Sequence, residues 1–390
     1  MAVCLVLIAS VAEANQDFVN WLNGFLPEAE RQGITTTTWN RAFSEITEPD
    51  ELVLERAAYQ PEFIQEIWEY LDTRVNPLSV EKGLEQARQR NATLTSLEQR
   101  FGVSRYVLLA IWSMETNYGA ALERRERLHY VPQALATLGW GDEKRSGFAR
   151  SQLIAALKIR QAGDISRENL IGSWAGAMGH TQFIPTIYLA YAVDMDGDGR
   201  RDIWNSVPDA LGTAANLLAG NGWRPGKAWG YEVVLPAGIG RYAEETKTLA
   251  EWRKLGVTGP GGRSFPQTDD NAILKVLAGE NGPGFLMMKN FFVIKRYNNS
   301  DKYALAVGLL ANWLAGQEGV QQKWPRPVDS LSIEEKTQLQ QLLRDKGYYD
   351  GEIDGQPGSA TREAIRQFEI QAGLQVNGMP TRSVLEALKK

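Results

Sequence analysis

One glutamate follows directly on an unusually apolar stretch of the chain. Eight of the nine residues from Tyr106 to Met114 are apolar, and Glu115 comes next. A helix of this composition should be buried nearly all round. Burial disfavours the ionised carboxylate and raises its pKa, and a neutral carboxyl group is what a general acid needs at neutral pH. Glu115 is therefore a candidate proton donor, and the alternative is a helix-end glutamate whose carboxylate simply reaches solvent.

The chain has too few histidines and cysteines for a catalytic site or metal site built mainly from these residues. The chain holds two histidines, His129 and His180, and one cysteine, Cys4. The histidines lie far apart in the sequence, which argues against a histidine-based triad and against a metal site with several histidine ligands. Catalysis must come from carboxylates, amides or hydroxyl groups.

A second cluster of acids has the spacing of a calcium-binding loop. Asp194, Asp196 and Asp198 alternate and are followed by Gly199, as in the first half of an EF-hand loop. The carbonyl of Arg200 would fall at the seventh position, whereas the twelfth position is Asn205 instead of the usual glutamate. We expect structural Ca²⁺ here, and no organic cofactor. The alternative is a solvated, aspartate-rich turn that binds no metal tightly.

The composition and net charge limit the kinds of molecule that the protein is expected to bind. The chain has 390 residues, enough for two or three domains, and its net charge of −5 comes without a basic stripe. This charge argues against nucleic acid or an anionic membrane surface as the main partner.

The N-terminal segment resembles a secretory signal. Residues 1–14 are apolar for about ten residues and end in Ala-Glu-Ala, a pattern typical of a signal peptide cut before Asn15. The run is too short to span a membrane. It lacks the usual basic residue at its start, which suggests that translation begins upstream.

Apolar periodicity predicts a mainly α-helical protein with a small β element. Residues 17–315 are mostly helical in pattern, with clear helices at 63–71 and 303–315 and a buried one after residues 96–101. Gly- and Pro-rich breaks flank the best strand candidate, residues 231–235. We expect one large domain over residues 15–320, which contains Glu115, and a proline-containing linker at 321–330.

The last sixty residues form a separate helical unit, residues 331–390. Helices are expected at 332–346, 359–372 and 381–388, with a Gly-rich loop at 347–358 between the first two. The apolar side chains expected to face inward are Leu339, Leu342, Leu343, Ile365, Phe368 and Leu385.

Glu115 lies in the block Met-Glu-Thr-Asn-Tyr-Gly, residues 114–119. The other informative blocks are residues 68–70, 145–148 and 172–185, the acidic loop from Asp194, and residues 296–300 with Tyr303. In this order, the blocks closely resemble the lytic murein transglycosylase B family, glycoside hydrolase family 103. Together they extend over most of residues 50–315. The resemblance implies a lysozyme-like helical transglycosylase domain.

The resemblance also implies a lyase that uses Glu115 twice. Glu115 would protonate the oxygen between N-acetylmuramic acid and N-acetylglucosamine. As a carboxylate it would then deprotonate the muramoyl C6 hydroxyl, which closes a 1,6-anhydro ring. Two alternatives remain: a peptidoglycan-binding scaffold without catalysis, and a hydrolytic muramidase.

Further site residues follow from the same resemblance. Ser173 would hydrogen-bond Glu115, Gln182 would bind sugar amide or hydroxyl groups, and Arg145 would hold a carboxylate of the substrate. The expected groove walls are Tyr297, Asn298 and Tyr303. The alternatives are close helix packing for the small-residue segment around Ser173, surface solvation for Arg145, and ordinary core for the three groove residues.

The resemblance also bears on the calcium loop and on the substrate groove. It implies one further acidic ligand in the loop, and it shows that one tyrosine common in relatives is absent from this chain. The family's elongated loop ends in an acid that corresponds to Asp209, so the EF-hand-like loop covers residues 194–209. Relatives often carry a tyrosine in the next helix, where this chain has Leu217, and the corresponding sugar contact is in doubt.

Residues 331–390 resemble a peptidoglycan-binding type 1 domain, most specifically in the Gly-Tyr-Tyr-Asp-Gly-Glu-Ile-Asp-Gly loop. Such a domain would hold the enzyme on its insoluble polymer. The expected partners are peptidoglycan glycan strands, with other cell-wall enzymes as further candidates. The expected setting is a monomer without a membrane span in the periplasm of a Gram-negative bacterium.

Overall fold

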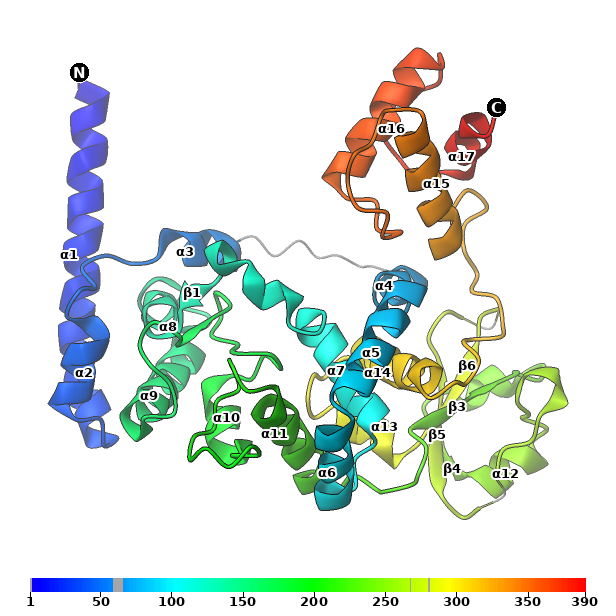
Figure 1. Ribbon diagram of the computed structural model, residues 1–390, viewed down its shortest axis with the longest axis horizontal. Helices are drawn as coiled ribbons and strands as arrows, with labels where there is room; N and C mark the ends of the chain where they lie inside the picture. Colours follow the sequence, from blue (N-terminus) through cyan, green and yellow to red (C-terminus); the bar gives the residue numbers. More distant parts are fainter. Residues whose placement is uncertain (1, 59–65, 267, 280) are drawn as a thin grey trace. The chain divides into compact units, whose positions relative to one another are not determined.

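The structure is a computed structural model that describes residues 2–58, 66–266, 268–279 and 281–390, without the side chains of residues 2–14. The chain folds into two compact units, and Figure 1 follows their elements in order. The first unit takes residues 1–63 and 90–223, and the second takes residues 64–89 and 224–390.

The first unit is built almost entirely from α-helices. They are α1 (Ala2–Arg31), α2 (Thr36–Phe43), α3 (Glu51–Ala58), α6 (Asn91–Phe101), α7 (Arg105–Thr116), α8 (Val131–Gly141), α9 (Ser146–Ala162), α10 (Pro185–Tyr191) and α11 (Val207–Gly220). Two short strands, β1 (His129–Tyr130) and β2 (Ile171–Gly172), pair antiparallel.

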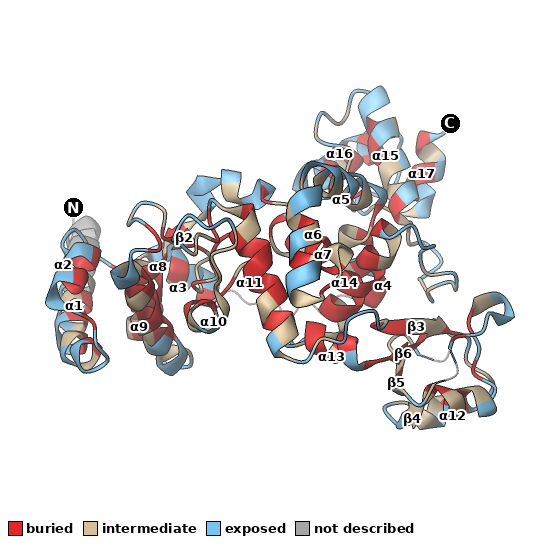
Figure 2. Cartoon of the chain, turned by 60° about the horizontal axis from the view of Figure 1, so that its bottom comes forward, coloured by how far each residue is buried: buried red, intermediate tan, exposed pale blue. Residues whose placement is uncertain are grey.

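Helix α7 is the buried helix that the apolar stretch predicts. It begins after Ser104, whose hydroxyl accepts a hydrogen bond from the N–H of Tyr106 at 3.3 Å. Its residues from Val107 to Trp112 are all buried. The helix contacts α6 and α11, and α11 is itself mostly buried along its length (Figure 2).

The second unit combines helices with a small sheet. Its helices are α4 (Ile67–Arg74), α5 (Pro77–Gln89), α12 (Leu249–Lys254), α13 (Lys289–Ile294), α14 (Asp301–Leu314), α15 (Ile333–Asp345), α16 (Ser359–Gln371) and α17 (Arg382–Leu388). Its strands are β3 (Gly230–Val233), β4 (Thr246–Thr248), β5 (Asn271–Val276) and β6 (Gly284–Met287).

The sheet is antiparallel throughout, in the order β3-β6-β5-β4. It covers an apolar core that includes Val233, Trp252, Leu274 and Leu286. Beside it, α14 contacts both α4 and α5, although more than 200 residues of sequence separate α14 from them.

The C-terminal helices form a core of their own. Leu339, Leu343, Ile365, Phe368 and Leu385 are buried in it, and Leu342 packs against it. Ser332 caps α15 through a reciprocal pair of hydrogen bonds with Glu335. This device satisfies otherwise unpaired N–H groups at the start of a helix.

The predicted fold class is confirmed, and the elements that were predicted match within a few residues, whereas strands β4 to β6 were not predicted. The expected helix at 303–315 is α14, and the expected strand at 231–235 is represented by β3. Residues 63–65 of the helix expected at 63–71 lie outside the described residues, and the remainder overlaps α4. Within the described part of the chain, no helix is long and apolar enough to cross a membrane.

Candidate active site

Glu115 lies in the last turn of α7, next to the residue that ends the helix. Its side chain is half-buried, whereas Ile111 and Trp112, one turn earlier, are almost fully buried. The carboxyl group is therefore carried on a rigid, well-packed element at the point where that element leaves the core.

The turn after Glu115 has an unusual backbone. Asn117, Tyr118 and Gly119 all have positive φ angles, of 50°, 58° and 94°. Residues other than glycine rarely adopt this left-handed region, and such conformations cluster where function constrains the chain. Burial raises the pKa of Tyr118 to about 12, so its phenol is neutral at physiological pH.

Thr116 ties the end of α7 to a second segment. Its hydroxyl donates to the carbonyl oxygen of His180 at 2.7 Å and accepts from the N–H of Gly119 at 3.2 Å. A Cβ on Gly119 would come within 2.8 Å of the His180 ring, so a glycine is needed there for steric as well as conformational reasons.

His180 is also held through its side chain. The indole N–H of Trp112 donates to His180 Nδ1 at 3.3 Å. Burial, reinforced by the positive charge of Arg90, lowers the pKa of His180 to about 4. The imidazole is therefore neutral at physiological pH, and because Nδ1 accepts a hydrogen bond, Nε2 carries its proton.

The segment around His180 is a tight chain of backbone bridges. Gly172 pairs with Met178, and Met178 pairs with Phe183. A Cβ on Gly172 would meet the carbonyl oxygen of Ala177 at 2.3 Å, and one on Gly179 would meet that of Ile203 at 2.4 Å. The glycines here thus serve close backbone contacts within the protein, and the segment that holds them is not helical.

Ser173 and Gln182 are the polar side chains of this segment that the sequence singled out. The Ser173 hydroxyl accepts from the N–H of Ala177 at 3.0 Å, which leaves its own proton to donate. The side-chain amide of Gln182 donates to the carbonyl oxygen of Gly179 at 2.9 Å, and the backbone of Gln182 has a positive φ of 50°. The role predicted for Ser173 toward Glu115 stays a prediction.

Arg145 precedes helix α9 and forms an ion pair with Asp142. Burial acts to raise the pKa of Asp142, but the hydrogen bonds from Arg145 outweigh it and lower that pKa. The guanidinium group also lies over the ring of Trp174, 5.8 Å from its centroid. Arg145 is thus half-buried beside the Ser173 segment, in contrast to a freely solvated arginine.

Tyr297, Asn298 and Tyr303 belong to the second unit. The two tyrosine rings stack at 6.4 Å with an angle of 10° between their planes. Tyr303 is buried, Tyr297 is half-buried and Asn298 is exposed. The burial of Tyr303 agrees with the alternative that it belongs to the core.

The acidic loop brings four carboxylates together. Asp194, Asp196, Asp198 and Asp209 each offer an oxygen, and these oxygens lie within 4.8 Å of one another. Asp209 is fully buried, and burial raises its pKa. Its oxygens accept hydrogen bonds from three backbone N–H groups, those of residues 195, 196 and 202, at 2.7–3.3 Å.

The remaining residues of the loop have structural partners. The side chain of Asn205 donates to Asp202 at 2.8 Å. The N–H of Arg200 donates to Asp198 at 2.8 Å. Beyond the loop, Leu217, which stands where relatives often have a tyrosine, is buried in α11.

Sequence reasoning missed the connection through Thr116, Trp112 and His180. The signal available was a small hydroxyl residue directly after the candidate acid. Its partner His180 is 64 residues away, so no local pattern could identify the pair.

Comparison with known proteins agrees with the resemblance seen in the sequence. Residues 17–312 match the family model of the transglycosylase SLT domain, and residues 334–388 match that of a peptidoglycan binding domain. The membrane-bound lytic murein transglycosylase B of Escherichia coli (strain K12) is 30% identical over 249 residues. That alignment covers 62% of this chain and 64%, somewhat less than two thirds, of the relative.

Two solved structures extend the comparison. SltB3 from Pseudomonas aeruginosa, in complex with NAG-anhNAM-pentapeptide, is 42% identical with a TM-score of 0.76, covering 96% of this chain and 99% of that one. The Escherichia coli lytic transglycosylase Slt35, in complex with calcium, is 25% identical with a TM-score of 0.63, covering 77% of this chain and 92% of that one. The chain therefore belongs to the transglycosylase SLT family of lytic transglycosylases and carries a peptidoglycan-binding domain at its C-terminal end.

Proposed function

We propose that the protein cleaves the β-1,4 bond between N-acetylmuramic acid and N-acetylglucosamine in peptidoglycan and releases 1,6-anhydro-muramoyl ends. The observation that carries the proposal is the position of Glu115, a half-buried carboxyl group at the end of a buried helix. That helix end is joined through Thr116 to the segment containing Ser173 and Gln182. The relative SltB3 was solved with an anhydro-muramoyl ligand, which is the type of product proposed here.

One carboxyl group suffices for both proton transfers. Glu115 donates its proton to the bridging oxygen as the bond from that oxygen to muramoyl C1 breaks. The resulting carboxylate removes the proton of the C6 hydroxyl as O6 bonds to C1, which restores the acid. No water is consumed, so the product is one water lighter than a hydrolytic one. General acid–base catalysis of this kind is worth roughly 10²–10⁴-fold in rate.

The surrounding polar residues would orient the sugar. In this proposal the Ser173 hydroxyl donates to Glu115, and the Gln182 carbonyl accepts from a sugar amide or hydroxyl group. Arg145 binds a carboxylate of the lactyl or peptide substituent. Tyr297 and Asn298 are the substrate-contacting residues proposed for the second unit, whereas the buried Tyr303 stacks on Tyr297. The proposal assigns no proton transfer to the two histidines. Burial lowers the pKa of His180 to about 4, so its ring is neutral, and the ring of His129 is buried against Asp50.

Ca²⁺ is proposed for the acidic loop. The donor set suits a hard cation, since Asp194, Asp196, Asp198 and Asp209 offer oxygens alone, and Ca²⁺ prefers several such ligands. The Arg200 carbonyl would add a further oxygen to these four. Asp209 lies in the first turn of α11, so an ion held here would fix the start of that helix. The related Slt35 was solved in complex with calcium.

We also propose export to the periplasm through the segment 1–14 as a signal peptide, with peptidoglycan strands as the main partner. The C-terminal match to a peptidoglycan binding domain supports this partner. Such a domain raises the local concentration of enzyme on an insoluble polymer.

Glu115→Gln tests the proposed catalytic residue and separates an enzyme from a binding scaffold. The variant keeps the shape of the side chain and loses the acid, so we expect solubilisation of purified sacculi to slow by roughly 10²–10⁴-fold while sacculus binding is unchanged. The matched control is Glu123→Gln, a change at an exposed glutamate after the turn, which should behave as wild type. Wild-type protein that binds sacculi without cutting them would support the scaffold instead, and full activity of Glu115→Gln would refute the site.

A further inference from the structure

The segment between the two domains is attached to the protein along its length. The N–H groups of Gln321 and Gln322 donate to the carboxylate of Glu232 on β3 at 2.9 and 2.8 Å. The ring of Trp324 stacks on Phe285 of β6, with 6.2 Å between centroids. These contacts hold the chain against the sheet before its prolines begin.

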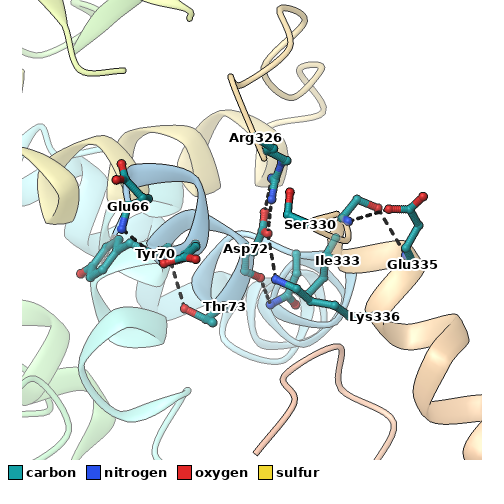
Figure 3. A network of polar contacts seen from close by, with 12 residues as sticks. Glu66, Tyr70, Asp72, Thr73, Arg326, Ser330, Ile333, Glu335 and Lys336 are labelled. Carbon is teal, nitrogen blue, oxygen red and sulfur yellow. Dashed lines mark hydrogen bonds and ion pairs between the residues drawn. The ribbon is translucent and has the colours of Figure 1, made fainter. Parts of the chain in front are cut away.

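The next contact is an ion-pair cluster around Asp72 in helix α4 (Figure 3). Arg326 donates to both Asp72 oxygens, each at 2.6 Å, and so forms a bidentate pair. Lys336 of α15 donates to the same carboxylate at 3.2 Å. The Asp72 side chain is only 8% exposed, so this carboxylate has exchanged most of its hydration for the two cations.

The cluster joins parts of the chain that belong to different domains. Asp72 lies within the residues that match the transglycosylase domain, and Lys336 within those that match the peptidoglycan binding domain. A second contact joins the same two domains. The side-chain amide of Gln356 donates to the carbonyl oxygen of Thr73 at 3.2 Å. Two polar contacts from the C-terminal domain thus meet adjacent residues of α4.

The far end of the connecting segment is fixed to the C-terminal domain. Ser330 forms a β-bridge with Thr381, and the N–H of Arg382 donates to Asp329 O at 3.1 Å. Leu331 is buried in the core of that domain. A segment anchored at both ends and in the middle differs physically from a flexible tether, whose ends explore many separations.

We propose that Asp72 is the docking site that holds the peptidoglycan-binding domain in one fixed orientation on helix α4, through Arg326 and Lys336. A buried carboxylate left without its cations is strongly disfavoured, so undocking must expose Asp72 to water or leave it unpaired. The bidentate geometry also fixes direction as well as distance. This inference is independent of the chemistry proposed for Glu115.

The orientation can be measured on the full chain by electron spin resonance distances. Spin labels are placed at Glu81→Cys in α5 and Gln367→Cys in α16, both exposed positions, with Cys4→Ser removing the native thiol. We expect one narrow distance distribution for this parent. Asp72→Asn, which removes the charge and keeps the shape, should broaden it severalfold. The matched control Arg366→Gln breaks an exposed ion pair with Glu363 inside α16 and should leave the distribution narrow.

Trypsin cleavage after Lys323 gives a second readout of the same state. Release of the segment should speed this cleavage by about tenfold or more in Asp72→Asn, and similarly in Arg326→Gln if the first variant folds poorly. Because the two residues are partners, the double variant should be cut no faster than the faster single variant. A broad distribution in the parent, or Asp72→Asn as narrow and as resistant as the parent, would overturn the proposal.

Discussion

Thr116→Val is the sharpest test of how the catalytic helix is held. Valine has nearly the shape of threonine, so the change removes the hydroxyl and little else. Thr116 is 2% exposed, and its hydroxyl makes the 2.7 Å bond to His180 O and accepts from the Gly119 N–H. That N–H also donates to the carbonyl oxygen of Thr116 at 3.1 Å, so it keeps a partner in the variant.

The main loss is therefore one carbonyl, that of His180. An unsatisfied buried polar group costs about 1–3 kcal/mol. At about 2–4 °C per kcal/mol for a domain of this size, Tm should fall by roughly 2–12 °C. Because the bond joins the end of α7 to the segment of Ser173 and Gln182, we also expect kcat on soluble glycan to fall with little change in KM.

Thr116→Ser is the control for this prediction. Serine keeps both hydrogen bonds and loses one methyl group, which costs about 1 kcal/mol of stability. Its kcat should stay close to wild type even where its Tm is lower, since the connection to His180 is intact. Differential scanning calorimetry and steady-state kinetics on both variants provide the readouts. A Thr116→Val protein with wild-type Tm and wild-type kcat would refute the reasoning.

Two further predictions concern metal and pH. Removal of Ca²⁺ by chelator should lower Tm relative to excess Ca²⁺, since an ion at 100 times its Kd adds about 2.7 kcal/mol to stability. Asp209→Asn should abolish that difference, and identical melts of the wild type with and without Ca²⁺ would count against the site. His180 has a folded pKa of about 4, below its ordinary value of 6.5, so the unfolded chain binds the extra proton between these pH values. Its contribution to stability is complete above pH 6.5 and is lost as pH falls toward 4, by about 3 kcal/mol in total. His180→Gln should flatten this part of the Tm–pH curve, and a curve that still parallels the wild type would contradict the assignment.

Local chemistry made much of the fold predictable. The three C-terminal helices could be located because each begins after a capping or glycine residue, Ser332, Gly358 and Thr381, and has regular apolar spacing. Glu115 could be singled out because a run of apolar residues ends at an acid.

Pairings across long stretches of sequence could not be predicted. Strands β4 to β6 were missed because their stability depends on partners far along the chain, such as Ile273 opposite Met287, and not on alternation within each strand. The prolines around Arg326 predict a connecting segment. Nothing in that segment, however, indicates that its arginine meets Asp72, 254 residues away.

In the candidate site, too, the local patterns could be predicted and the long-range contacts could not. The acid, the calcium-loop spacing and the small-residue segment are local patterns that the sequence displays. The bond from Thr116 to His180, which joins two of them, depends on how α7 packs against a loop 64 residues later. Burial of the apolar part of α7 can be predicted from its composition, whereas the segments that pack against it depend on the fold.

Digestion of purified sacculi by the wild-type enzyme in ¹⁸O-water tests the central claim most directly. If Glu115 transfers a proton from the muramoyl C6 hydroxyl and no water attacks, the released muropeptides are unlabelled and one water lighter than hydrolytic products. Mass spectrometry separates these outcomes in one experiment. Muramic acid ends that are reducing and carry one ¹⁸O would contradict the account and identify a hydrolase.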